Sequence, residues 1–356
     1  MSYVLEVYQL DVQATTLTRI DTIQTFQNLS FITSLNGIGS ARFELSVYDP
    51  KATKNNLIRF RNHIAIKRND VIVWAGPITD INVSYADVKG TIIVDCNDWL
   101  YHLKTRYTAS ILNYPSQDIS TIAWNLLSTT QATTNGYLAI VQGSTPVGIS
   151  RQFTWEYKPL YDALIDMSNL IGGNDFSFTP TEVDGKLTGV LFNTYPNRAG
   201  RQRTDLNAFE MGVNMKDLTM KTYQNLYNSS IMQGSGTGEN VLLSTLNYGG
   251  SQTGYTRREV ITPVKDVSLA ATLSAYNAAW LNIYSVEQYL FDLNIYQGMN
   301  PKYGDYVLGD LVQIVCNIGN PDGFLNFKVW GRIKEIVVTV DVNAAEVITP
   351  RVSVYN

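Results

Sequence analysis

Hydrophobic periodicity constrains this chain most: apolar residues recur at every second position near both ends and at helical spacing in the middle. The segment ARFELSVYD has the alternation of a half-buried strand. One side of that strand carries Ala41, Phe43, Leu45 and Val47. The segment HIAIKRNDVIVWAGPITDINVSY alternates on both sides of the polar turn at 68–70, and GTIIVDC continues the pattern. Residues 1 to about 100 are therefore expected to form a small antiparallel sandwich or barrel.

Helical spacing begins near residue 97. Short helices are predicted within NDWLYHLKTRY, capped by Asn97 or Asp98, and within QDISTIAWNLLSTT, capped by Ser116 or Asp118. The clearest helix pattern is KPLYDALIDMSNLIGG, where Pro159 suits the first turn and two glycines supply the stop. Its apolar stripe consists of Leu160, Ala163, Leu164, Met167, Leu170 and Ile171. The segment FSFTPTEVDGKLTGVLFN is predicted to form a hairpin around Asp184-Gly185.

Strand patterns return after residue 212 and are interrupted by one predicted helix. The strand candidates are YNSSIMQG, ENVLLSTLNY, SVEQYLFDLNIY, DYVLGDLVQIVCN, FLNFKVWGRIKEIVVTVDV and EVITPRVSVYN. The helix, SLAATLSAYNAAWLNIY, has on one face Leu269, Leu273, Tyr276, Trp280 and Ile283. The predicted fold class is α+β and mainly β, with β-barrel-like domains at 1–106 and 213–356 and a mixed α/β insert at 107–212.

The chain carries few charges for its length, with 16% charged residues where about 25% is usual. It also has 22 tyrosines, a residue type enriched at protein interfaces. These features predict a surface that is neutral or covered by other subunits. The net charge of −4 argues against a nucleic-acid-binding domain, which would cluster Lys and Arg. The densest basic stretches, residues 59–68 and 197–203, are interpreted as solvated faces or loops.

The N-terminal segment MSYVLEVYQLDVQATTL lacks the basic and apolar regions of a secretory signal. No apolar run reaches the roughly 18 residues that a membrane-spanning helix needs. A soluble protein without a membrane anchor is therefore expected. Cys96 and Cys316 lie far apart in the sequence and are expected to be buried, reduced thiols rather than a redox pair or a zinc site.

Residues that could carry chemistry are few. The histidines His63 and His102 show no metal-ligand spacing and no link to a nucleophile, and no GxSxG elbow supports a Ser-His-Asp triad. A group of acids in the middle section leaves a hydrolase as a weaker alternative. These acids are Glu156, Asp162, Asp166, Asp175, Glu182 and Asp184. No catalytic, cofactor-binding or metal-binding residue is predicted, and no cofactor is expected.

The glycine cluster Gly234-Ser235-Gly236-Thr237-Gly238 raises the question of a phosphate-binding loop. A Walker loop would continue with Gly-Lys-Ser/Thr and open a helix, whereas Glu239 and Asn240 follow here. A dinucleotide fingerprint fails as well, because Glu239 stands where the third glycine belongs. The cluster is therefore predicted to be a tight hairpin turn with residues at positive φ.

Several motifs follow one another in a distinctive order. The N-terminal ones are ARFELSVYDP, VIVWAGPITDINVS and DCNDWLYHLKTRY, which carry Trp74, Gly76, Asp98, Trp99, Leu100 and Arg106. The C-terminal half adds YQNLYNSSIMQGSGTGENV, a strand, glycine turn and strand, and then DYVLGDLVQIV with VWGRIKEIVVTVD, a closing hairpin. Over nearly the whole chain, this arrangement resembles the baseplate-hub or tail-tip hub proteins of tailed bacteriophages.

The resemblance implies a homotrimer whose two β domains alternate around a ring, with pseudo-sixfold symmetry that matches a hexameric tail tube. It implies a structural, non-enzymatic virion subunit, assembled in the host cytoplasm, through which DNA passes without specific nucleic-acid binding. Expected partners are a tail tube or distal tail protein, a central spike or fibre, and a tape measure protein.

Some members of that family continue into a peptidase or lysozyme-like domain, whereas this chain stops at Asn356. Any wall-degrading activity is therefore expected to reside in another protein. Two alternatives stay open: a cell-wall hydrolase of the tail tip, and a carbohydrate-binding module for host attachment, since β sandwiches with exposed aromatic residues suit sugar stacking.

Overall fold

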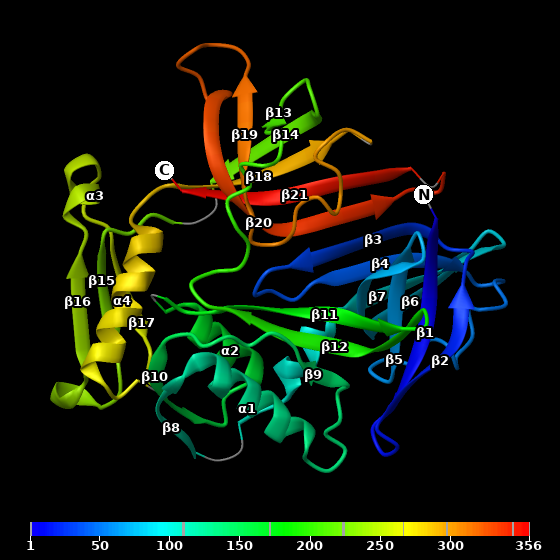
Figure 1. Ribbon diagram of the computed structural model, residues 1–356, viewed down its shortest axis with the longest axis horizontal. Coiled ribbons are helices and arrows are strands. Elements are labelled where there is room, and N and C mark those ends of the chain that lie inside the picture. The colour runs from blue at the N-terminus through cyan, green and yellow to red at the C-terminus, as the bar shows by residue number, and fades with distance from the viewer. Residues whose placement is uncertain are drawn as a thin grey trace.

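The protein is built mainly of β-strands, and its α-helices lie in the middle of the chain and in the C-terminal section (Figure 1). This confirms the mainly-β class predicted from the sequence. The computed structural model describes residues 2–108, 111–170, 172–222, 225–265, 267–296, 298–343 and 345–355.

The N-terminal section consists of antiparallel strands and a 3₁₀ helix. Its elements are β1 (Tyr3–Asp11), β2 (Thr16–Ile23), β3 (Gln27–Ser34), β4 (Ser40–Ser46), β5 (Asn62–Arg68), β6 (Val71–Ala86), β7 (Lys89–Asn97) and η1 (Trp99–Thr105). The predicted β5–β6 hairpin is confirmed, with Asn69 and Asp70 at positive φ in its turn. The predicted cap is confirmed too, because the Asp98 carboxylate accepts a hydrogen bond from the backbone N–H of Leu100.

The middle section mixes strands and helices, as predicted. Its elements are β8 (Ile111–Asp118), α1 (Ile119–Gln131), β9 (Ile140–Gln142), β10 (Ser150–Glu156), α2 (Leu160–Ser168), β11 (Asp175–Val183), β12 (Lys186–Tyr195) and β13 (Phe209–Glu210). Helix α2 ends at Ser168, earlier than its apolar pattern suggested, and Leu170 is buried beyond the helix end. Ile171, the last residue of the predicted stripe, lies outside the described residues.

The C-terminal section contains the remaining strands. Its elements are β14 (Met215–Thr222), β15 (Ser229–Gln233), η2 (Gly238–Asn240), β16 (Leu243–Asn247), α3 (Gly249–Gly254), β17 (Glu259–Pro263), α4 (Ala270–Tyr284), β18 (Gln288–Ile295), β19 (Leu311–Asn317), β20 (Asn326–Val340) and β21 (Glu346–Tyr355). Helix α4 buries Leu273 and Tyr276 as predicted, but Leu269 precedes the helix and is exposed.

The largest sheet joins both ends of the chain. Its strand order is β14-β18-β21-β20-β3-β4-β7-β6-β5-β1-β2, with β19 paired to β20 and β13 paired to β19. Strands β3 and β20 are antiparallel, with Phe31 opposite Val338. Their pairing covers two sheet edges that would otherwise expose unpaired backbone groups.

The expectation of two barrel-like units is therefore not confirmed. Within the part of the chain that the structure describes, no sheet closes into a barrel, and the N-terminal and C-terminal strands continue one another across the β3–β20 pair. One hydrophobic core runs beneath this junction, where Phe31 and Phe43 share a cluster with Phe291 and Val338. A second core fills the space between η1, the middle helices and the β11–β12 hairpin.

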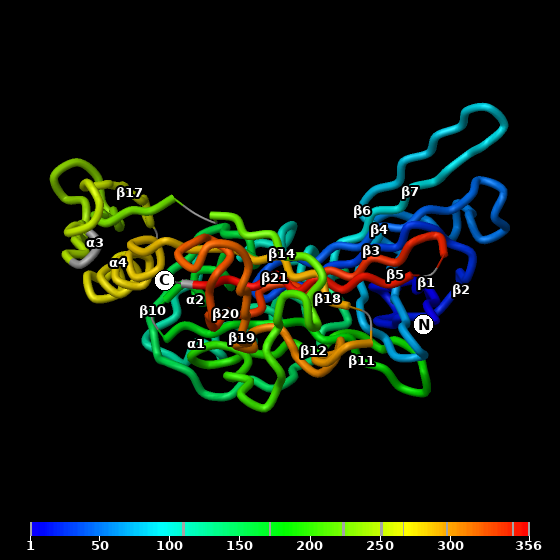
Figure 2. Tube along the Cα trace, turned by 90° about the horizontal axis from the view of Figure 1, so that it is seen from above, coloured from blue at the N-terminus to red at the C-terminus, as the bar shows by residue number. Residues whose placement is uncertain are grey.

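The β6–β7 hairpin extends well beyond the body of the molecule. Seen from above, its end projects beyond the other elements (Figure 2), past the point where β4 pairs with β7 at Ser46 and Thr91. The two strands remain paired from Ile78 and Cys96 out to Ala86 and Lys89. Residues 82–89, which form the projecting part, are all exposed.

Candidate functional site

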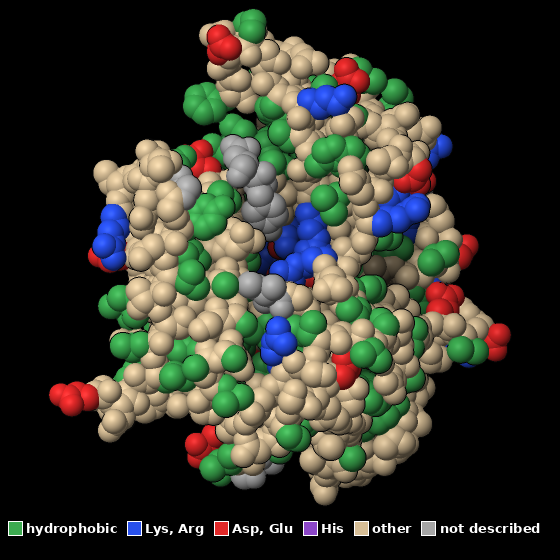
Figure 3. All heavy atoms as spheres, turned by 60° about the vertical axis from the view of Figure 1, so that its left-hand side comes forward, with side chains coloured by type: hydrophobic (Ala, Val, Ile, Leu, Met, Phe, Trp, Pro, Cys, Tyr) green, Lys and Arg blue, Asp and Glu red, His purple; other side chains and the backbone are tan. Residues whose placement is uncertain are grey.

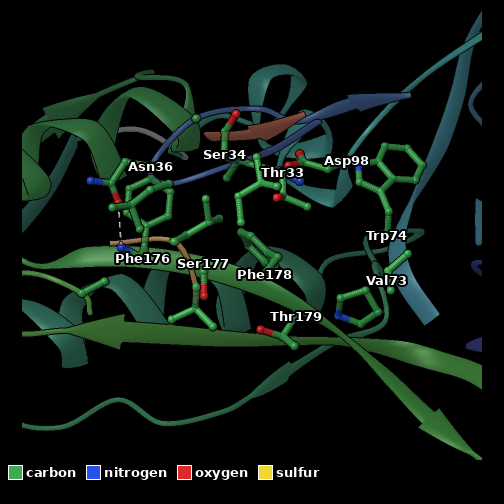
Figure 4. A pocket seen from close by; sticks show the side chains of 18 of the residues that line it. Thr33, Ser34, Asn36, Val73, Trp74, Asp98, Phe176, Ser177, Phe178 and Thr179 are labelled. Atoms are coloured by element: carbon green, nitrogen blue, oxygen red, sulfur yellow. Dashed lines mark hydrogen bonds between the residues drawn. The ribbon is translucent and has the colours of Figure 1, made fainter. Parts of the chain in front are cut away.

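A cavity of about 460 Å³ lies between the N-terminal sheet, the β11–β12 hairpin and the loop that precedes β19 (Figure 4). Its walls are mainly hydrophobic. The hydrophobic lining residues are Leu35, Val73, Trp74, Ala75, Trp99, Leu100, Phe176, Phe178, Pro180, Val190, Ala199, Tyr303, Tyr306, Val307, Leu308 and Ile336. Such a size and lining are typical of sites that bind an organic ligand or an apolar segment of a partner protein, for which volumes of roughly 300–1,000 Å³ are usual.

The aromatic walls are held in place by the strands that carry them. Trp74 on β6 donates its indole N–H to the carbonyl oxygen of Ile32, at 3.2 Å. Phe176 and Phe178 are two positions apart on β11, so their side chains leave the same face of the strand. The Phe178 ring packs on the Phe192 ring of β12, with 5.4 Å between centroids.

Asn36 holds three elements together at one end of the cavity. Its amide nitrogen donates to the Ser168 hydroxyl at 2.9 Å and to the Asp175 carboxylate at 2.6 Å. Its amide oxygen accepts from the backbone N–H of Phe176 at 2.8 Å, the bond drawn in Figure 4. Asn36 thereby links the loop after β3 to α2 and to β11.

Asp98 also borders the cavity. Burial raises the pKa of its carboxyl group to about 7, although the hydrogen bonds from the backbone N–H groups of Gly39 and Leu100 lower it. Both carboxylate oxygens are therefore engaged with backbone, which is the geometry of a helix cap. The arrangement fixes the β4 and η1 ends and leaves no carboxylate oxygen dedicated to a substrate.

A buried ion pair joins β11 to β20 beside the cavity. The Arg332 guanidinium donates to the Asp175 carboxylate and to the Ala199 carbonyl, and the Ala199 N–H donates back to Asp175 at 2.6 Å. Burial raises the pKa of Asp175, but the charge and hydrogen bonds of Arg332 outweigh it and leave that pKa below its usual value. For Lys334, burial and the nearby Arg332 charge lower the pKa to about 8.

Tyr306 has an unsatisfied group in this region. The residue is only 2% exposed and lines both the large cavity and a smaller one of about 160 Å³. Its hydroxyl is buried and has no hydrogen-bond partner among the described residues.

The structure brings together the two histidines that the sequence left separate. The Nε2 atoms of His63 and His102 lie 2.9 Å apart, and the His63 ring packs against Trp99 at 4.5 Å between centroids. Burial lowers the pKa of His63, with the His102 charge as a second cause. Burial and then the Arg106 charge lower the pKa of His102 to about 4. No sequence signal pointed to this contact.

Three of the six acids of the middle section, Asp166, Asp175 and Glu182, have separate partners. Asp175 forms the buried pair with Arg332, Asp166 accepts the Trp155 indole N–H at 3.0 Å, and Glu182 accepts the Ile72 backbone N–H at 3.2 Å. Among the described residues, no group of three His, Cys, Asp or Glu side chains could hold a metal ion.

The glycine cluster lies in a hairpin connection, as predicted, but the predicted tight turn is wrong, because residues 234–242 separate β15 from β16 and include the 3₁₀ helix η2. Strands β15 and β16 pair antiparallel on either side of it, and Gly236 and Gly238 have φ values of 99° and 59°. A β-carbon on Gly236 would lie 2.2 Å from the carbonyl oxygen of Asn240. Close backbone approach thus explains that glycine without any bound phosphate.

The basic stretch 59–68 is not simply a solvated face. Lys67 and Arg68 are largely buried and pair with Glu6 and Glu346, because β5 lies inside the sheet rather than at a surface loop. In 197–203, Arg203 is likewise mostly buried and pairs with Asp310 at 2.9 Å. Both cysteines are buried and free, as predicted.

Charged side chains are few on the exposed surface, as expected from the low charge content of the sequence. On the face shown in Figure 3, charged side chains are sparse, neutral polar and hydrophobic atoms dominate, and several Lys and Arg side chains gather in a central hollow. In the described parts of the chain, no helix is both long enough and apolar enough to cross a membrane.

Comparison with known proteins places the fold. No family model and no curated protein matches the chain. The crystal structure of the 43 kDa tail protein of prophage MuSo2 from Shewanella oneidensis is 14% identical, with a TM-score of 0.65 over 99% of this chain and 98% of that one. The tail protein from Neisseria meningitidis MC58 is 12% identical, with a TM-score of 0.60 over 99% and 97%.

A third structure is similar over the same extent. The prophage tail protein gp18 from Listeria monocytogenes EGD-e is 10% identical, with a TM-score of 0.55 over 99% of this chain and 94% of that one. All three have the fold of this chain over nearly their whole length. The resemblance to phage tail proteins inferred from the motif order is thereby confirmed at the level of the fold.

Proposed function

We propose that this chain is a structural hub subunit of a phage tail tip or baseplate, located in the virion. In this role, three copies form a ring that connects the tail tube or distal tail protein to a central spike or fibre and lets DNA pass. The observation that carries the proposal is the likeness to the MuSo2 tail protein, which spans 99% of this chain. A tape measure protein is a further proposed neighbour.

The surface of the chain supports a role inside an assembly. Large hydrophobic side chains are exposed in turns and loops, among them Val88, Val147 and Phe324, each at least 80% exposed. Few charged side chains separate such residues, as expected for surfaces that other subunits cover. The division into units at 1–106, 107–212 and 213–356 remains part of this proposal.

A non-enzymatic role is also part of the proposal. Three of the acids that could have formed a hydrolytic pair, Asp175, Asp166 and Glu182, are engaged with Arg332, Trp155 and the backbone of Ile72. Neither a cell-wall hydrolase nor a carbohydrate-binding module is favoured by a specific arrangement of the described residues.

Electron microscopy of purified tail particles that carry a tagged copy of this chain tests the proposal. The tag is expected at the tail tip, in three copies around the tube axis. A tag along the tube, on the fibres or absent from the particles would contradict the hub role. Zymography on peptidoglycan with the purified protein tests the enzyme alternative, because clearing that disappears in Asp166→Asn or Glu182→Gln would replace the structural role with a catalytic one.

A further inference from the structure

The projecting end of the β6–β7 hairpin carries a cluster of exposed hydrophobic side chains, here called the hairpin tip: Val83, Tyr85 and Val88, with Tyr48 beside them. These four residues are between 62% and 80% exposed. The hairpin stands away from the body in Figure 2, so no other part of the described chain covers its end. Exposed apolar groups gathered on a projecting element are typical of a contact with another protein.

The two tyrosines of the hairpin tip contact each other and the neighbouring strand. The hydroxyls of Tyr48 and Tyr85 are 3.0 Å apart, and the Tyr85 ring lies over Gly90 on the neighbouring strand, where a β-carbon would come within 2.9 Å of the ring. Rigid, exposed tyrosines lose little conformational entropy on binding and are frequent anchors of protein interfaces.

The turn at the hairpin tip is strained. Asp87 and Val88 have φ values of 48° and 59°, a conformation suited to Asn-Gly and unfavourable for a β-branched residue. Val88 is also 80% exposed, so packing within the chain does not explain it. Strained, exposed residues are concentrated at functional sites, and here the side chain itself is the feature available to a partner.

The same chain offers a concave counterpart in the 460 Å³ cavity. Val307, at its edge, is 56% exposed, whereas Phe176 and Trp74 form a buried apolar wall.

The hairpin tip cannot reach the cavity of its own chain. Strand β6 runs from the cavity wall at Trp74 to the end of the hairpin at Ala86, and twelve residues of strand extend about 40 Å. A contact between the two surfaces must therefore join different molecules. Because one surface is convex and the other concave, such a contact is head-to-tail, the kind that generates rings.

We propose that the hairpin tip of one copy of this chain inserts into the apolar cavity of a second copy. The contact rests on the proposed function, since it supplies the subunit contact of the ring. Val88 and Tyr85 act as the anchors, and the partner's cavity provides the apolar walls.

Cysteine cross-linking between two purified variants tests the contact. Val88→Cys protein is mixed with Val307→Cys protein, each full length, and oxidised. The expected result is a disulfide-linked pair formed at least tenfold more efficiently than with Val147→Cys in place of Val88→Cys. Val147 is a matched control for Val88, because it is 83% exposed and lies outside the hairpin tip. The native cysteines are buried, so the wild-type protein gives the background.

Val88→Gly provides a second test, in which thermal stability is kept or raised while self-association weakens. Glycine tolerates positive φ, so this variant should melt at the same or a higher temperature, while its self-association in analytical ultracentrifugation weakens at least tenfold. Unchanged association, equal cross-linking with Val147→Cys, or a wild type that stays monomeric at every concentration would overturn the contact. A normal ring of Val88→Gly subunits at tail tips would also overturn it while leaving the hub role intact, whereas absence of the wild-type chain from tail tips would remove the hub role.

Discussion

At the scale of single residues, the His63–His102 pair makes stability depend on pH. In the folded chain the pKa of each of these histidines lies below the unfolded value of about 6.5, and that of His102 is about 4. As the pH falls, the unfolded chain therefore binds protons at a higher pH than the folded chain does. The stabilisation is fully present above pH 6.5 and is lost as the pH falls towards 4. We expect the free energy of unfolding to drop by roughly 2–3 kcal/mol between pH 7.5 and 4.5 from His102 alone, measured by urea denaturation.

The control for this prediction is His102→Gln, which keeps a polar side chain but does not titrate in this range. Its unfolding free energy should vary less between the two pH values than that of the wild type. An identical pH dependence in both proteins would show that other groups dominate acid unfolding.

The sequence located His63 in a strand and the helix start at Asp98, but the contact between the two histidines arises from the packing of η1 over β5, which no local pattern encodes.

Gly236 offers a second test at this scale. Replacing it with valine adds strain at a φ of 99° and places a β-carbon 2.2 Å from the Asn240 carbonyl oxygen. Gly236→Val should therefore lower the free energy of unfolding by more than about 2 kcal/mol, measured by thermal or chemical denaturation. Gly238→Val isolates the strain, because Gly238 has positive φ but nothing within 4 Å of an added β-carbon. Equal losses in the two variants would contradict the steric explanation, and ATP or NAD binding by the wild type would reopen the phosphate-loop interpretation.

At the scale of elements, the Asp175–Arg332 pair should govern how firmly β11 is held to β20. Removing one member of a buried pair leaves the other charge uncompensated, so Asp175→Asn should cost about 3–5 kcal/mol of unfolding free energy. Glu259→Gln breaks the exposed pair with Arg257 and should cost less than about 1 kcal/mol. Urea denaturation of both variants at pH 7.5 measures the difference, and losses of similar size would show that the buried pair has no special role.

The sequence predicted individual elements better than their partners. Strands with clear alternation, such as β4, β7 and β19, and the β11–β12 hairpin were all expected, because turn residues and periodicity are local signals. Strand β2 was not, since only its last residue is buried and its pattern is irregular. The cavity was not predicted either, because its walls come from segments as distant as Trp74, Phe178 and Val307.

At the scale of the whole molecule, the sequence pointed to separate units at the two ends, whereas β3 and β20 pair across roughly 300 positions. Nothing in either strand specifies its partner, because both simply alternate apolar and polar residues. What did carry information over this range was the order of motifs along the chain. The three tail-protein structures share the fold of this chain at 10–14% identity.

The shared sheet leads to a prediction about fragments. A fragment of residues 1–106 would expose the β3 edge and the hydrophobic face that packs with Phe291 and Val338. We expect this fragment to be poorly soluble or to bind the dye ANS, and to lack a cooperative thermal transition, because it loses both edge pairing and part of its core. Circular dichroism melting and ANS fluorescence of the fragment, compared with the full chain, measure this.

The same reasoning predicts how the full chain unfolds. Since β3 and β20 belong to one sheet and the core beneath them is shared, both end sections should melt in a single calorimetric transition. Fluorescent labels placed at Val83 and at Phe324, both exposed, would report the two sections separately and should give coincident midpoints. Two outcomes would contradict this prediction: a fragment of residues 1–106 that melts cooperatively near the midpoint of the full chain, or labels that report well-separated midpoints. Either outcome would show that the N-terminal unit folds on its own and that the β3–β20 pairing adds little to its stability.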